Sequence, residues 1–501
     1  MTPGRNLLAG LTNSIWSALI GLAVVPFYLK YLGIEAYGLI GFFATTQAVL
    51  SLLDMGMAPT INREVARCSA LGNLREAGKL LHTLAVVYWC MAGAIALMII
   101  ALAPLITGYW LQSKQLLPQT ISHAVMLMGL VIACRWPIGL YQGALIGAQR
   151  LTVSSGINIV MATIGSLGAV AVLAFISPTI EAFFIWQACM GFVYAITIRS
   201  SVWRIIGKQD HTKFDINKLK SVWRFTAGMS GIALSATIFT QLDKIILSKT
   251  LGLDEFGHYM LASIVAGSLY LLIMPFYQAI SPRLTSLVIK GDKDELIYTY
   301  RFGTRMLATV LFPTAMVLAI FPMELVHLWT GNQTIALSVA PVISILVLGS
   351  ALHGVMFFPY ALQLAYGMTR LPLTINAILM VILIPVTFFL SLEYGAIGGA
   401  IAWLVLHILY VLFGTWLTHR QLLKGIGMMW FLNDVAVPLC LSMIVGLVGY
   451  YLIQDVGYSS SIKLMFGALM ALVAVLLSLV SMPRVFKIDL LNKINLNNKN
   501  S

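Results

Sequence analysis

The sequence predicts an all-α integral membrane protein with 14 transmembrane helices, and two observations lead to this fold class. Of the 501 residues, 59% are hydrophobic and only 10% are charged, and the mean hydropathy is +0.91, far outside the range of soluble domains. Apolar runs of about 20 residues, the length that crosses the hydrocarbon core as a helix, recur throughout the chain. Only short polar connections separate these runs.

Each apolar run is assigned one span, and the longer runs allow tilted helices. The chain start has the charge and apolar stretch of a signal sequence but no small-residue cleavage site, so we expect it to stay uncleaved as part of the first span. The expected spans are residues 7–29, 36–56, 80–106, 118–146, 151–176, 180–200, 222–248, 256–282, 302–321, 335–364, 371–391, 395–418, 433–453 and 462–482.

An internal repeat divides the chain. YLGIEAYG at 31–38 returns as TLGLDEFG at 250–257, and GNLREA at 72–77 returns as GDKDEL at 291–296, both at an offset of 219 residues. An even number of spans per repeat keeps both copies in one orientation, which predicts two parallel six-helix lobes around a central cavity, plus two C-terminal helices. The expected parts are residues 1–200 (first lobe), 201–221 (basic cytoplasmic linker), 222–418 (second lobe) and 419–501 (two further spans and a short polar tail).

The formal net charge of +13 follows the predicted topology. Nearly all loop lysines and arginines, with Arg301 and Arg305 among them, fall on one side of the membrane, and the other side keeps Lys30, Lys114, Lys249 and Lys463. The positive-inside bias therefore predicts that both termini are cytoplasmic. The basic surplus is best explained by topology and by contact with anionic membrane lipids, and we expect no nucleic-acid partner.

Several kinds of chemistry have no motif in this sequence. The five cysteines lack CxxC or Cys/His spacing, so no metal site is predicted. No GxxxxGK[ST], HExxH or GxSxG pattern occurs, so we expect neither an ATP site nor another cofactor. Any driving force would come from a proton or sodium gradient, from the membrane potential or from the substrate gradient.

Charged residues inside spans are the candidate functional residues. An ionised side chain at the bilayer centre costs roughly 2.5 to 3.5 kcal/mol on insertion scales, so such a residue usually faces a bundle interior or an aqueous cavity. The candidates are Asp54, Arg135 and the neighbours Asp243 and Lys244, with His353 as a further titratable residue.

Span seven carries a polar stripe. Helical spacing puts one face together from Thr226, Ser230, Thr237, Gln241, Lys244 and Ser248, with Asp243 on its shoulder. One interpretation is a local Asp/Lys arrangement satisfied by its neighbours near the outer interface. The other is a cavity lining in which Lys244 and Gln241 meet an anionic substrate, while Asp243 orients Lys244 or takes a proton. The repeat counterparts of the pair are Val24 and Val25, which favours function over architecture.

The other candidates also leave two interpretations open. Arg135 lies near mid-membrane with Gly139 and Gln142 on its face; its guanidinium suits bidentate phosphate binding, and the alternative is a structural pair with Asp54. Asp54 is either a substrate-binding residue or a helix-end charge satisfied near Arg63 or a loop amide. His353 is either a hydrogen-bonded core histidine or a site of proton coupling.

A family resemblance follows from two stretches, LGIEAYGLIGFFATTQAVLSLLDMGMAPTINREVAR and QLDKIILSKTLGLDEFG. The chain resembles, over essentially its whole length, the Wzx-type O-antigen flippases of the multidrug/oligosaccharidyl-lipid/polysaccharide exporter superfamily. The resemblance implies a transporter of the bacterial inner membrane that moves undecaprenyl-diphosphate-linked oligosaccharide from the cytoplasmic to the periplasmic leaflet by alternating access. It also implies that Lys244 and Arg135 meet the pyrophosphate or an acidic sugar.

Three rival functions stay open. A cation-coupled multidrug or small-molecule exporter of the same fold would be expected to have acidic cavity residues. Here Asp54 and Asp243 are balanced by Arg135 and Lys244. A membrane glycosyltransferase or polysaccharide polymerase would want a large outer loop with catalytic carboxylates, and the short outer loops argue against it. A scaffold for other polysaccharide-assembly proteins would need no cavity. We therefore expect a transporter and no enzyme, with lipid-linked oligosaccharide and membrane lipids as its partners.

Overall fold

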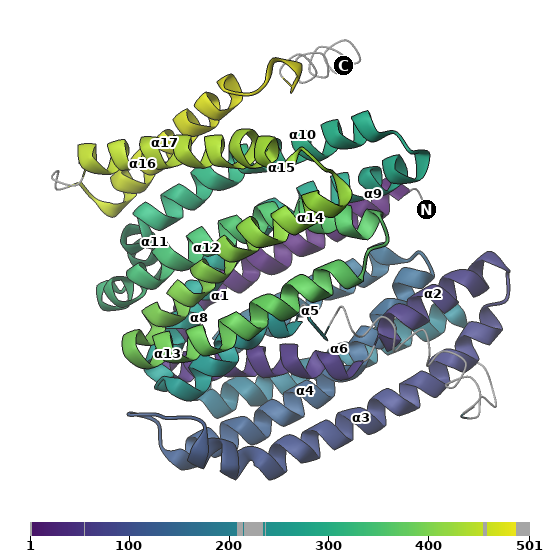
Figure 1. Ribbon diagram of the computed structural model, residues 1–501. Helices are drawn as coiled ribbons and strands as arrows, with labels where there is room; N and C mark the ends of the chain where they lie inside the picture. Colours follow the sequence, from purple (N-terminus) through teal and green to yellow (C-terminus); the bar gives the residue numbers. More distant parts are fainter. Residues whose placement is uncertain are drawn as a thin grey trace. The chain divides into compact units, whose positions relative to one another are not determined.

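The structure is a computed structural model that describes residues 3–54, 56–207, 214, 234–235, 237–453 and 458–486, and nearly all of these residues are helical (Figure 1). In this part of the chain, ten helices are long and apolar enough to cross a membrane, or eleven if the bent pair α8 (Leu253–Gly267) and α9 (Tyr270–Lys290) forms one span. The prediction of an all-helical, multi-span membrane protein is confirmed. The number 14 stays a prediction.

The chain forms two compact units, Met1–Gly257 and His258–Ser501. The predicted linker, residues 201–221, and the predicted start of the second lobe at residue 222 fall largely outside the described residues. The predicted division into lobes, linker and C-terminal spans therefore stays a prediction.

The first unit is built from long helices and one short amphipathic helix. Its first helix, α1, contains Gly33 in a non-helical conformation (φ 80°, ψ 175°), which a residue with a Cβ adopts only with strain. The two predicted spans 7–29 and 36–56 are thus joined by a one-residue kink. The elements are α1 (Pro3–Leu50), η1 (Ser51–Asp54), α2 (Met57–Ala70), α3 (Leu74–Tyr109), α4 (Pro118–Gly147), α5 (Leu151–Phe175), α6 (Ile180–Ile206), helical residues 237–250 and the start of α8.

Helix α2 lies where the sequence analysis expected no element. Its buried residues include Met57, Ile61, Val65 and Cys68, spaced so that they share one face, while charged residues occupy the rest of the helix. Two glycines of α4 let it approach closely: a Cβ on Gly143 would lie 2.6 Å from the Ala58 carbonyl oxygen, and Gly147 stands in the same relation to Asn62.

Helices α3, α4 and α6 lie side by side and form the core of the first unit (Figure 1). The buried cluster between them includes Leu81 and Tyr88 of α3, Leu140 of α4, and Ile198 and Val202 of α6. Helix α5 packs on α1 and on α6. These five long helices carry most of the side chains that line the cavity described below.

The second unit surrounds α12, which packs against α9, α10, α11 and α13. Helix α13 is interrupted at Gly395 (φ 58°, ψ −135°), between the predicted spans 371–391 and 395–418. The elements after α9 are α10 (Lys293–Ile320), α11 (Pro322–Thr330), α12 (Gln333–Ala365), α13 (Arg370–Leu409), η2 (Tyr410–Gly414), α14 (Thr415–Leu422), α15 (Gly427–Met429), η3 (Trp430–Ala436), α16 (Val437–Ile453) and α17 (Ser460–Val480).

Two arginines of α10, which the sequence analysis grouped with the cytoplasmic basic surplus, bind the C-terminal helices, and 14% of the Arg301 side chain remains exposed. Arg301 pairs with the fully buried Asp434 of η3, with 2.7 Å between Nε and Oδ2. Arg305 is fully buried and donates to the carbonyl oxygens of Asn433 and Ser478 and to the Ser481 hydroxyl. The predicted cytoplasmic location of these two residues stays a prediction. The structure adds that both fasten the C-terminal helices to α10.

A cavity with a buried arginine

The first unit contains a cavity of about 810 Å³ between α1, η1, α3, α4, α5 and α6, with Ala58 of α2 also at its wall. Its wall mixes apolar side chains with polar side chains from all six elements. The polar members include Gln47, Ser51, Asp54, Tyr88, Arg135, Asn158, Ser166, Gln187 and Tyr194. Two sequence-predicted site residues, Asp54 and Arg135, are therefore brought to one cavity.

Arg135 extends from α4 into the cavity and is held by a neutral partner. Its Nη2 donates to Oε1 of Gln187 on α6, and its guanidinium lies 5.7 Å from the ring centroid of Phe43. Gly191 makes room for it, because a Cβ there would lie 3.0 Å from the Arg135 Cγ. Within the described ranges no carboxylate forms an ion pair with Arg135, so the cation is available to an anion in the cavity.

A second polar contact joins α4 and α6 two helical turns further along. Gln142 donates to the Tyr194 hydroxyl at 2.7 Å, and that hydroxyl donates to Oδ1 of Asn158 at 3.0 Å. The amide of Asn158 in turn donates to Oδ1 of Asn13 at 2.7 Å. This chain of hydrogen bonds ties four helices together and fixes the amide and hydroxyl groups of the cavity wall.

Asp54 lies at the end of η1, where the chain turns toward α2. Its carboxylate accepts a hydrogen bond from the Tyr88 hydroxyl and another from the Ala58 amide, the latter at 3.3 Å. A backbone amide therefore satisfies Asp54, although it lies in the first turn of α2 and not in a loop as predicted. An ion pair between Asp54 and Arg135 does not occur among the described residues. Asp54 remains in the cavity wall while local donors satisfy its carboxylate oxygens.

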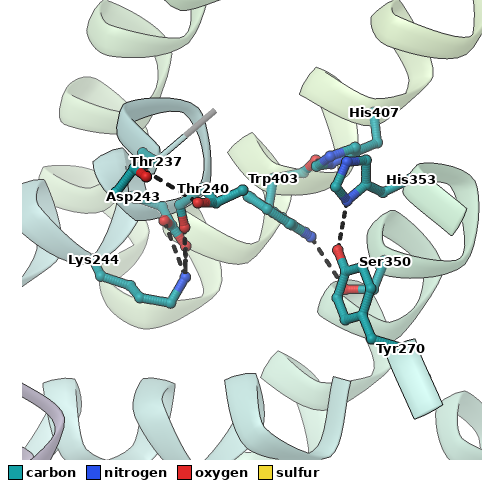
Figure 2. A network of polar contacts seen from close by, with 9 residues as sticks. All are labelled: Thr237, Thr240, Asp243, Lys244, Tyr270, Ser350, His353, Trp403 and His407. Carbon is teal, nitrogen blue, oxygen red and sulfur yellow. Dashed lines mark hydrogen bonds and ion pairs between the residues drawn. The ribbon is translucent and has the colours of Figure 1, made fainter. Parts of the chain in front are cut away.

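Asp243 and Lys244 form a local pair (Figure 2). The Lys244 Nζ lies 3.2 Å from Oδ2 of Asp243 and donates to the Thr240 carbonyl oxygen at 3.1 Å. Asp243 is buried, and 16% of the Lys244 side chain is exposed. This is the local arrangement weighed from the sequence, and neither residue lines the cavity around Arg135.

The predicted polar stripe of this segment is only partly described. Thr226 and Ser230 lie outside the described residues, and Gln241 is half-buried on the described part of the helix. Ser248 is buried and accepts a hydrogen bond from Nε1 of Trp110 at 3.0 Å. Ser248, at this end of the stripe, therefore holds the helix against the segment that follows α3.

His353 belongs to a cluster in the second unit (Figure 2). Its Nδ1 lies 2.5 Å from the Tyr270 hydroxyl, and its ring centroid lies 4.7 Å from that of His407. Nδ1 of His407 lies 2.8 Å from the Trp403 carbonyl oxygen, and because a carbonyl only accepts, this nitrogen carries a hydrogen. The sequence analysis singled out one histidine, and the fold brings a second one beside it.

The sequence analysis missed the neutral members of the cavity wall on α6. Gln187, Gly191 and Tyr194 recur on α6 at spacings of four and three, the same spacings that separate Arg135, Gly139 and Gln142 on α4. This shared spacing on α4 and α6 was the signal that could have identified the α6 residues. A search restricted to charged residues could not find them.

Comparisons with known proteins show the family to which the chain belongs. A sequence profile described as "Polysaccharide biosynthesis protein" matches residues 30–338, more than half of the chain. The chain belongs to this family. It is a membrane transporter of polysaccharide biosynthesis and not an enzyme.

Individual relatives and solved structures agree with this assignment. A protein of Shigella flexneri named "Putative O-antigen transporter" is 22% identical over 425 residues, which cover 82% of this chain and 97% of that protein. The structure named "Lipid II flippase MurJ, inward closed conformation" aligns with a TM-score of 0.68 at 17% identity and covers 94% of this chain and 97% of its own. An inward-facing multidrug resistance MATE family transporter of the MOP superfamily aligns with a TM-score of 0.64 at 15% identity, covering 81% of this chain and 95% of its own. The family member described here therefore has the fold shared by MurJ and MATE transporters.

Proposed function

We propose that this protein moves a lipid-linked oligosaccharide, a polysaccharide repeat unit on undecaprenyl diphosphate, from the cytoplasmic to the periplasmic leaflet by alternating access. Family membership and the O-antigen transporter name of the Shigella relative support the substrate class. The observation that carries the proposal is the Arg135 guanidinium, which lies in a cavity of about 810 Å³ and is held by the neutral Gln187. A cation held in this way suits a diphosphate or an acidic sugar.

The architecture proposed for this function keeps 14 spans in two parallel six-helix lobes and a C-terminal pair. The kinks at Gly33 and Gly395 support it, because each divides one long helix into two segments of span length. The bent pair α8 and α9 adds another span. We place the protein in the bacterial inner membrane with both termini cytoplasmic, as the positive-inside bias predicts.

Other proposed substrate-binding residues are Asp54, Gln241, Asp243 and Lys244. Asp54 shares the cavity with Arg135, which supports a role beside the same ligand. Lys244 keeps part of its side chain exposed while it holds Asp243, so it can exchange that carboxylate for a substrate anion. Proton coupling is proposed at His353 or Asp243, and the contacts of His353 with Tyr270 and His407 support the first.

A complementation experiment tests the function and the arginine together. In a host strain that lacks the gene, cells expressing Arg135→Ala are expected to carry at least tenfold less surface polysaccharide than cells expressing the wild type at equal protein levels. They are also expected to accumulate lipid-linked units. Arg135→Lys is expected to restore only part of the surface polysaccharide. Lysine keeps the positive charge but lacks the planar guanidinium that binds phosphate through two parallel hydrogen bonds. Arg67→Ala is the control, since Arg67 is exposed and pairs with Glu64.

Two outcomes would contradict the proposal in different ways. Full restoration by Arg135→Ala would overturn the role of the arginine and leave the flippase function standing. Normal surface polysaccharide in the deletion strain, together with vesicles that extrude a small organic cation and do not flip a lipid-linked oligosaccharide, would establish the exporter instead.

A further inference from the structure

A second cavity in the first unit lies apart from the Arg135 cavity. It measures about 370 Å³ and is bounded by α3, α4 and α6. No residue lines both cavities. Its wall combines one arginine, one histidine and three large aromatic side chains. The lining residues that matter here are His82, Val86, Trp89, Tyr141, Arg199 and Trp203.

These side chains lie at one depth in the bundle. His82 is eight residues after the start of α3 at Leu74, Tyr141 is six before the end of α4 at Gly147, and Arg199 is seven before the end of α6 at Ile206. At 1.5 Å per residue, each is about 9–12 Å inside its helix end. All three ends belong to the same side of the bundle, so the pocket forms a single level near that side.

This level matches the boundary between lipid headgroups and hydrocarbon. The 36, 30 and 27 residues of α3, α4 and α6 give helices of about 54, 45 and 40 Å, each longer than the hydrocarbon core of about 30 Å. These helices exceed the core by about 12, 8 and 5 Å at each end, so a point 9–12 Å inside the ends lies within about 6 Å of the core boundary, near which tryptophan and tyrosine gather. Val86 and Cys90 are exposed beside the aromatic rings, and they offer an apolar surface to an acyl chain.

The pocket carries a positive charge and therefore suits an anionic ligand. Among its lining residues there is no carboxylate. Arg67 and Lys79 of the same unit are neutralised by Glu64 and Glu76, at 2.9 and 3.0 Å, whereas Arg199 forms no ion pair with any described residue. Arg199 is exposed, so its guanidinium can meet a phosphate that arrives from the membrane.

We propose that this pocket binds the phosphate headgroup of an anionic phospholipid, with Arg199 on the phosphate, Trp89 and Trp203 beside the glycerol region, and the acyl chains along α3. Basic pockets between transmembrane helices are a common site for anionic lipid headgroups. The inference does not depend on which substrate the transporter moves, because it uses a separate cavity and separate residues.

Tryptophan quenching in lipid nanodiscs tests the proposal on the full-length protein. Brominated phosphatidylglycerol, titrated into phosphatidylcholine discs, is expected to quench Trp89 and Trp203 at a mole fraction several-fold lower than brominated phosphatidylcholine requires. Subtracting the signal of a Trp89→Phe/Trp203→Phe variant isolates these two residues. Equal quenching by the two lipids would overturn the proposal.

Variants on one helix separate the pocket from general surface charge. Arg199→Gln is expected to abolish the preference for phosphatidylglycerol, and Arg199→Lys to keep most of it. Arg204→Gln is the control, because Arg204 is an exposed arginine of α6 that does not line the pocket. An equal loss in Arg199→Gln and Arg204→Gln would contradict a specific site.

A competition arm distinguishes the two sources of lipid phosphate. Unbrominated phosphatidylglycerol is expected to relieve the quenching by its brominated form at lower mole fractions than undecaprenyl diphosphate does. If undecaprenyl diphosphate were the stronger competitor, the pocket would belong to the transported lipid and the phospholipid proposal would be wrong. Thermal stability of each variant, measured alongside, identifies a variant that fails to fold.

Discussion

Gly38 of α1 and Gly257 of α8 lie against each other, and each occupies the same position of the repeated motif, YLGIEAYG or TLGLDEFG. A Cβ on Gly38 would lie 2.4 Å from the Leu253 carbonyl oxygen, and a Cβ on Gly257 would lie 2.4 Å from that of Ile34. The contact is therefore reciprocal. The two copies of the motif cross each other through their glycines within the first unit.

The acidic residues of the two motifs clamp one loop. Glu35 accepts hydrogen bonds from the amides of Lys114, Gln115 and Leu116 in the loop after α3, and its repeat mate Asp254 pairs with the Lys114 Nζ at 2.9 Å. The Asp254 carboxylate raises the pKa of Lys114 above its usual value. Both copies of the motif therefore hold the same piece of chain.

We predict that Gly38→Ala and Gly257→Ala lower the thermal unfolding temperature of the purified protein. Each added methyl group would meet a backbone oxygen that cannot move aside, and such overpacking costs about 1–3 kcal/mol. Gly21→Ala on α1 is the matched control, because a Cβ there meets nothing within 4 Å. Unfolding temperatures equal to that of Gly21→Ala would show that the two helices can move apart without a loss of stability, which would contradict the prediction.

Much of the fold was predictable from the sequence because hydrophobicity marks the spans. Helix α2 was missed since its charged positions lower its hydrophobicity, so only its spacing of apolar residues indicated it. The burial of Arg305 could not be predicted, because its partners Asn433 and Ser478 are 128 and 173 residues away in sequence. In the site, Arg135 was identified by the energetic cost of a buried charge, whereas Gln187 carries no charge and gave no such signal.

Gly191→Ala is predicted to impair transport by displacing Arg135. The new Cβ would lie 3.0 Å from Cγ of Arg135 and 3.3 Å from Cβ of Cys134, so the arginine must shift away from Gln187. We expect surface polysaccharide to fall several-fold in the complementation assay while the protein remains in the membrane at wild-type levels. Gly156→Ala on α5 meets nothing within 4 Å and should behave as wild type. Full activity of Gly191→Ala would mean that the Arg135 position tolerates displacement.

Arg305→Ala is predicted to destabilise the protein far more than Arg283→Ala. Removing Arg305 deletes its hydrogen bonds to the Asn433 and Ser478 carbonyl oxygens and to the Ser481 hydroxyl, and a hydrogen bond to a charged group contributes about 1.5–3 kcal/mol. Arg283 pairs with Glu295 on the surface, where such pairs contribute about 0–1 kcal/mol. Thermal unfolding of the two variants in the same detergent measures the difference. Similar unfolding temperatures would contradict the role of Arg305 as the fastening of the C-terminal helices.

The last prediction concerns the histidine cluster of the second unit. If His353 takes up the coupling proton, His353→Gln should remove the dependence of flipping on an imposed pH gradient, because glutamine retains hydrogen bonding to Tyr270 and cannot titrate. Tyr270→Phe should shift this dependence along the pH axis without removing it, since it deletes the partner and leaves the imidazole. The measurement is flipping of a fluorescent lipid-linked oligosaccharide in vesicles, with and without the gradient. His123→Gln is the control, because His123 is an exposed histidine of α4 in the other unit. A His353→Gln variant that still responds to the gradient as wild type does would make His353 a packed core residue and direct the search for the coupling site to Asp243.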